Sequence, residues 1–153
     1  MKILNAAAMA ALMLSSVSTA QAETALPALK AQATAEAAVA EHVDALNNCD
    51  WDRLIAQYPE DGQFFLSNTV IDGRAAIGEL FAGFCKDHAD GGLNGLKFTA
   101  VKTTVIGDTI VTLWSGEAPF LAEPYMSSDA YITKDGLIQT QVSTFDGAAL
   151  KMK

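Results

Sequence analysis

The chain has 153 residues, of which 50% are hydrophobic and 18% are charged, a composition typical of one folded domain rather than of a disordered segment. Asp and Glu outnumber Lys and Arg by 18 to 10, which gives a formal net charge of −8. Such a surface repels phosphate backbones, so we expect no nucleic-acid partner.

The first 22 residues have the pattern of a secretory signal peptide. Lys2 precedes an apolar run over residues 3–14, and the segment Ala20–Ala22 presents small residues at the two positions that signal peptidase reads. The apolar run is shorter than the roughly 20 residues that a bilayer-spanning helix needs. We therefore expect cleavage between Ala22 and Glu23, a secreted or periplasmic mature protein, and no stable membrane anchor.

The N-terminal half of the mature chain has helical periodicity. Residues 23–30 contain a proline and are expected to form a flexible leader, followed by a single domain over residues 31–153. Within this domain, apolar residues recur at three- and four-residue steps. This spacing predicts three helices: residues 31–47, residues 51–58, and a third from Arg74 to Cys85.

The C-terminal half has the two-residue alternation and the Thr, Val and Phe content of strands. Turns at Gly107-Asp108 and at Asp135-Gly136 divide it, the second as a type I′ hairpin. Helices followed by an antiparallel meander define an α+β domain with the helices on one face of a curved sheet. The four long strands are predicted at 96–106, 109–117, 125–134 and 137–145, and two short ones at 62–67 and 69–71.

Export places Cys49 and Cys85 in an oxidising compartment, where an even number of cysteines usually pairs. The alternative is two separate buried thiols. Two cysteines without a third or fourth ligand nearby do not make a zinc site. His88, with an Asp on either side in a Gly-rich run, is more typical of a solvated turn. We expect no metal and no cofactor.

Several short strings occur in a recognisable order: residues 43–52 (VDALNNCDWD), 58–62 (YPEDG), 72–77 (DGRAAI) and 129–138. Together they resemble the nuclear transport factor 2-like superfamily, which includes the SnoaL-like polyketide cyclases and the ketosteroid isomerases. The resemblance implies a cone-shaped, cystatin-like roll, in which three N-terminal helices pack on a curved antiparallel sheet around a deep apolar pocket. It also implies a possible homodimer through the outer sheet face.

The resemblance carries over to a few site positions. Ketosteroid isomerases use a Tyr and a protonated Asp to hold the substrate oxygen, and a second Asp as base. Here His42 stands at the Tyr position, Asp129 at that of the protonated acid and Leu66 at that of the base. His42 and Asp129 are therefore the candidate catalytic residues. Leu66 cannot accept a proton, which argues against steroid-type isomerisation.

The pocket is expected to bind a small apolar molecule. Asp129 and Tyr131 are two residues apart in one predicted strand and so point the same way. Around Trp114 the register stays open: either Ile110, Thr112 and Trp114, or Val111, Leu113 and Ser115, line the cavity. The candidate ligand-binding residues are Val39, Tyr58, Leu66, Phe81, Trp114 and Tyr131.

Three functions remain open at this point. The first is acid/base isomerisation, cyclisation or dehydration by His42 and Asp129. The second is a non-catalytic periplasmic binding or sensor module, which the missing base at Leu66 favours. For His42 itself, the alternative to a catalytic role is a core histidine hydrogen-bonded to one acceptor, with no ligand. The third is a dimerising interaction protein that uses its outer sheet face. The sequence does not decide whether the chain is an enzyme.

Overall fold

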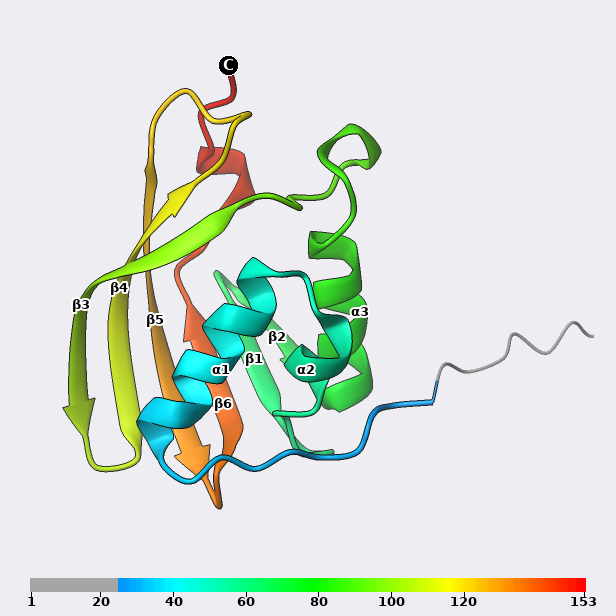
Figure 1. Cartoon of the computed structure of the whole chain (residues 1–153), viewed down its shortest axis with the longest axis vertical. Coiled ribbons are helices and arrows are strands. Elements are labelled where there is room, and N and C mark those ends of the chain that lie inside the picture. Colours follow the sequence, from blue (N-terminus) through cyan, green and yellow to red (C-terminus); the bar gives the residue numbers. More distant parts are fainter. Residues whose placement is uncertain (1–24) are drawn as a thin grey trace, which may run out of the picture.

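The computed structural model describes residues 25–153 (Figure 1), so the expected signal peptide and its cleavage site lie outside the described residues. The helices of the described part are α1 (Ala35–Asn47), α2 (Trp51–Ile55) and α3 (Arg74–Phe84), with two 3₁₀ turns, His88–Asp90 and Gly147–Ala149. The strands are β1 (Gln63–Leu66), β2 (Thr69–Asp72), β3 (Lys97–Ile106), β4 (Thr109–Glu117), β5 (Tyr125–Lys134) and β6 (Leu137–Ser143).

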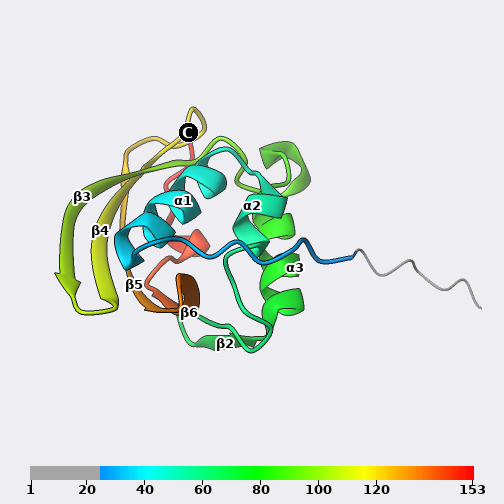
Figure 2. The same ribbon diagram turned by 60° about the horizontal axis from the view of Figure 1, so that its bottom comes forward.

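The six strands form one sheet in the order β2-β1-β6-β5-β4-β3. The sheet curves around α1 without closing, and α2 lies on the other side of that helix with α3 beyond it (Figure 2). This confirms the α+β cone. The expectation of an antiparallel sheet holds for every pairing except β1 with β6, which is parallel, with Gln63 opposite Thr140. The β1–β2 hairpin joins the meander of β3 to β6 through β6, a strand far along the chain. Local turn signals in the sequence do not reveal such a pairing.

Side-chain caps explain where the helices begin. The Thr34 hydroxyl accepts a hydrogen bond from the Ala37 amide at 3.1 Å, so α1 begins at Ala35 rather than at residue 31. Asp50 caps α2 in the same way by accepting from the Arg53 amide at 3.2 Å. Helix α2 ends at Ile55, earlier than predicted.

The concave face of the sheet and the helices enclose the core. Leu54, Ile55 and Ile77 from α2 and α3 are fully buried. On β4, Ile110 and Trp114 are buried together with Thr112, whereas Val111 and Leu113 are exposed. The register left open by the sequence is therefore settled: the side chains of Ile110, Thr112 and Trp114 face inward.

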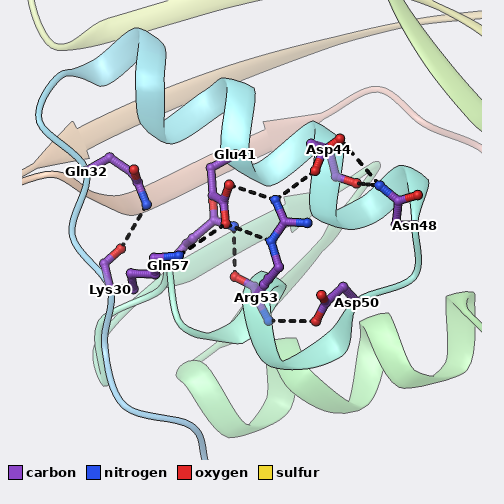
Figure 3. A network of polar contacts seen from close by, with 8 residues as sticks. All are labelled: Lys30, Gln32, Glu41, Asp44, Asn48, Asp50, Arg53 and Gln57. Atoms are coloured by element: carbon purple, nitrogen blue, oxygen red, sulfur yellow. Dashed lines mark hydrogen bonds and ion pairs between the residues drawn. The ribbon is translucent and has the colours of Figure 1, made fainter.

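A polar network fastens α1 to α2 (Figure 3). The Arg53 guanidinium donates to both carboxylate oxygens of Glu41, at 2.9 and 2.7 Å, and to Asp44 at 2.7 Å. Two parallel N–H···O bonds fix the orientation of a guanidinium better than one. Hydrogen bonding to Arg53 lowers the pKa of Glu41, so this carboxylate stays charged in mildly acidic solution.

Helix α3 is held at both ends. At its beginning, the buried Arg74 donates to the carbonyl of Ile55 at 2.9 Å and pairs with Glu60 at 3.1 Å. Just after its end, Cys85 forms a disulfide with Cys49, with the two Cα atoms 5.4 Å apart. This confirms the expected pairing and links the turn between α1 and α2 to the end of α3.

The described part of the expected leader lies against the domain. The Lys30 amide donates to the Ala56 carbonyl at 2.7 Å, and the Gln32 amide donates to the Gly136 carbonyl at 2.8 Å. Leu26 packs against the core cluster. These contacts tie the segment to the turn after α2 and to the β5–β6 hairpin.

Candidate functional site

One cavity of about 500 Å³ opens between α3 and the concave face of β4, β5 and β6. Most of its wall is aliphatic and aromatic, including Leu66, Phe81 and Trp114. Its charged lining residues, Glu79, Lys86 and Asp90, are exposed to solvent. Pockets of this size and composition are typical of small-molecule sites.

The deeper wall carries a polar cluster built by the pairing of β5 with β6. Asp129 lies opposite Ser143, and Tyr131 lies opposite Gln141. Because inward-facing residues alternate along a strand, these four side chains share the concave face. All four line the cavity, as does Ser127, two residues before Asp129.

Hydrogen bonds within the cluster converge on one oxygen of Asp129. The Tyr131 hydroxyl donates to Oδ2 at 2.9 Å, and the Gln141 amide donates to the same atom at 3.1 Å. The buried Tyr58 hydroxyl donates to Oε1 of Gln141 and so fixes which way the amide points. The other carboxyl oxygen of Asp129, Oδ1, is buried and has no partner.

The surroundings of Asp129 raise its pKa. Burial raises the pKa of this carboxyl above its usual value, and the Ser143, Tyr131 and Gln141 side chains oppose that effect only in part. When Asp129 is protonated, the proton belongs on Oδ1, because Oδ2 already accepts two hydrogen bonds.

His42 makes no hydrogen bond with Asp129. It is fully buried on α1, and neither ring nitrogen has a hydrogen-bond partner. The rings of Tyr58, Phe81 and Tyr131 surround it edge-on, with centroids 5.6 to 5.9 Å away. Burial lowers the pKa of His42 to about 3, so its imidazole is neutral at physiological pH.

A second hollow of about 460 Å³ lies between α1 and strands β3 and β4. Val39 lines this hollow and not the cavity at α3. The Trp114 ring lines both and forms part of the wall between them.

The predicted site residues therefore fall into two groups, those that line the cavity and those that do not. Leu66, Phe81, Trp114 and Tyr131 line the cavity with Asp129, whereas Tyr58 lies behind Gln141 and His42 lies among the aromatic rings. Ser127, Gln141 and Ser143 were not among the predicted site residues. Ser127 could have been predicted, because it has the same strand parity as Asp129. Gln141 and Ser143 could not, because a register shift between Ile132 and Thr133 moves the pairing one residue away from the one that the Asp135-Gly136 turn alone implies.

Two features were looked for in residues 25–153 and not found. No helix in this range is long and apolar enough to cross a membrane. In the same range, no group of three or more His, Cys, Asp or Glu side chains is placed to hold a metal ion.

Comparison with known proteins gives the family. The curved sheet and the three helices are those of the nuclear transport factor 2-like superfamily. Within it, the sequence model of the SnoaL-like domain matches residues 39–141, more than half of the chain. The chain therefore belongs to the SnoaL-like domain family. A search of curated proteins finds no match.

Solved structures share the fold at low sequence identity. An NTF2-like protein of unknown function from Cytophaga hutchinsonii is 17% identical, with a TM-score of 0.61 over 78% of this chain and 96% of that one. TerC co-crystallised with polyporic acid is 17% identical, with a TM-score of 0.62 over 75% and 93%. A protein with a ketosteroid isomerase-like fold from Catenulispora acidiphila, in complex with trimethylamine, is 16% identical, with a TM-score of 0.56 over 74% and 88%. These likenesses show the fold alone.

Proposed function

We propose that the chain is an exported SnoaL-like protein that binds one small, mostly apolar molecule in the cavity at α3. The observation that carries this proposal is a mostly apolar cavity of about 500 Å³ whose wall holds one polar cluster, centred on the buried Asp129. An apolar wall provides affinity through the hydrophobic effect, and one placed polar group orients the ligand. The complexes with polyporic acid and with trimethylamine show that this fold can hold small molecules in other proteins.

Export is supported by two independent features. The N-terminal sequence has the three parts of a signal peptide, and the disulfide between Cys49 and Cys85 suits an oxidising compartment. Mature protein isolated from the periplasm or the medium should begin at Glu23.

Acid/base catalysis is the second candidate. Asp129 favours it, since a neutral carboxyl can donate a hydrogen bond to an oxygen on which negative charge develops. Isomerisation, cyclisation or dehydration also needs a group that takes up a proton. Leu66 cannot do so, and His42 is neutral and shielded by aromatic rings. Binding without turnover is therefore the function that the geometry supports best.

A second copy of the chain is the proposed occupant of the outer sheet face. Val111 and Leu113 on β4, Ile132 on β5 and Val142 on β6 are all exposed. Val111 and Val142 both lie opposite Ala130, so the three residues form a continuous apolar row across three strands. Contiguous apolar surface of this kind is characteristic of interfaces.

Gly83 offers a direct test of binding. It lines the cavity, and a Cβ added there meets no other atom within 4 Å. Gly83→Phe should therefore put a ring into the cavity without disturbing the core, and Gly83→Ala is its matched control. We expect 2-naphthol to bind to the wild type and to Gly83→Ala but not to Gly83→Phe, as measured by calorimetry. Equal binding to all three proteins would place the ligand elsewhere and refute the site.

A further inference from the structure

We propose that the cavity at α3 selects an apolar cation, a ligand of the quaternary ammonium class, over a neutral or anionic molecule of the same shape. The inference rests on the proposed function and specifies the class of ligand. Three properties of the cavity support it: the aromatic rings in its wall, the small number of polar atoms left free there, and the charges at its opening.

Aromatic rings reach the cavity from α3 and from four strands. They belong to Phe64 of β1, Phe81 and Phe84 of α3, Phe98 of β3, Trp114 of β4 and Tyr131 of β5. The face of an aromatic ring is the negative part of its quadrupole and attracts a cation. One such contact strengthens binding by roughly two- to fivefold at an exposed site, and by more where water is excluded. A wall with several rings therefore favours a ligand that combines hydrocarbon surface with positive charge.

The polar cluster in the wall leaves few hydrogen-bonding atoms for a ligand. Oδ2 of Asp129 already accepts from Tyr131 and Gln141. Oδ1 of the same carboxyl is buried and not open to the cavity. Oγ of Ser143 accepts from the Phe145 amide at 3.1 Å. A primary ammonium group brings three N–H donors that each need an acceptor, whereas a quaternary ammonium group brings none. The wall therefore suits a cation without N–H groups.

The opening of the cavity carries more negative than positive charge. Among the described residues that line it, the exposed charged side chains are Glu79, Asp90 and Lys86. Within residues 25–153, none of these three side chains takes part in an ion pair. The chain as a whole has a formal net charge of −8. At a separation of about 8 Å in water, each carboxylate strengthens the binding of a cation roughly twofold. The opening thus favours cations and disfavours anions.

Four probes that share a benzyl group separate the alternatives. They are benzyltrimethylammonium, its neutral isostere neopentylbenzene, the primary cation benzylammonium and the anion phenylmethanesulfonate. Affinities can be measured at pH 7 and low salt by displacement of 2-naphthol. The wild type should bind benzyltrimethylammonium most tightly, by roughly two- to fivefold over neopentylbenzene, which is the value of one exposed contact between a cation and a ring.

Two double variants test the role of the opening. Glu79→Gln, Asp90→Asn removes both carboxylates there and should reduce the preference for benzyltrimethylammonium over neopentylbenzene by roughly fourfold, twofold for each charge. The reduction should become smaller at high salt. The matched control Asp108→Asn, Asp135→Asn removes two exposed carboxylates from the turns before β4 and β6, at the other end of the molecule from the segment that follows α3 (Figure 1), and should keep the preference.

Three results would overturn the inference. The first is that neopentylbenzene or benzylammonium binds the wild type at least as tightly as benzyltrimethylammonium. The second is tightest binding of phenylmethanesulfonate, which would give Lys86 the leading role at the opening. The third is an unchanged preference in Glu79→Gln, Asp90→Asn. Failure of all four probes to bind would refute the proposed function together with the inference.

Discussion

The disulfide between Cys49 and Cys85 permits a quantitative prediction. The two residues are 36 positions apart in sequence. In the loop-entropy description, a cross-link of this span removes about 13 cal/mol/K of entropy from the unfolded chain, which corresponds to about 4 kcal/mol at 25 °C. We therefore expect the double variant Cys49→Ala, Cys85→Ala to lose about 4 kcal/mol of unfolding free energy. For a domain of this size, such a loss is a large part of the total stability.

Urea unfolding followed by circular dichroism measures this difference. The oxidised wild type, the wild type reduced with dithiothreitol and the double Ala variant should be compared at one pH. The reduced protein and the variant should coincide, because both lack the cross-link. The slope of free energy against urea should rise when the cross-link is removed, since the unfolded chain then exposes more surface.

A loss below about 1 kcal/mol would contradict the entropic reasoning. The cavity supplies a further check, because Lys86 follows Cys85 directly and lines the opening. Without the cross-link, the affinity for 2-naphthol should fall even under conditions where the domain remains folded. An unchanged affinity would show that the bridge does not position this part of the wall.

Three further predictions concern charge and association. Burial raises the pKa of Asp129, so the folded protein holds this proton more tightly than the unfolded chain does. The free energy of unfolding should therefore decline as the pH rises from about 4 through the raised pKa. Thermal unfolding across this range should show a smaller decline in Asp129→Asn and an unchanged decline in the exposed control Asp135→Asn. Arg53→Met removes both ion pairs of a partly exposed guanidinium, and urea unfolding should register a loss of about 1 kcal/mol or less that shrinks further at high salt. Val142→Lys places a charge at the centre of the outer face, and sedimentation velocity should show a dimer in the wild type and a monomer in the variant; a monomeric wild type would refute the proposed pairing.

The sequence predicts most of the fold because its local signals agree. The stripe from Ile77 to Phe84 and the Asp135-Gly136 turn both appear as expected in the structure, the latter with φ angles of 52° and 75°. The parallel pairing of β1 with β6 is not predictable in this way, since no turn connects the two strands. The start of α1 was predicted from hydrophobic periodicity alone, although Thr34 is a residue type that commonly caps helices and does so here.

Less of the candidate site than of the fold could be predicted from the sequence. The inward direction of Trp114 depends on strand register, which reverses with a shift of one residue. The separation of His42 from Asp129 depends on how the aromatic rings of Tyr58 and Tyr131 fill the space around the imidazole, and side-chain packing of this kind leaves no periodic pattern in a sequence. The resemblance to the ketosteroid isomerases located both positions along the chain but could not give the distance between them.

The parallel neighbours β1 and β6 also bear on when the protein can fold. Gln63 finds its sheet partner only at Thr140, close to the C-terminal end of the domain. A nascent chain that still lacks β6 has its hairpin detached from the meander, and contacts between such distant segments form slowly. Under the export proposed above, such a delay would keep the polypeptide unfolded enough to pass through a secretion channel, and the sheet would be completed only after the last strand had emerged.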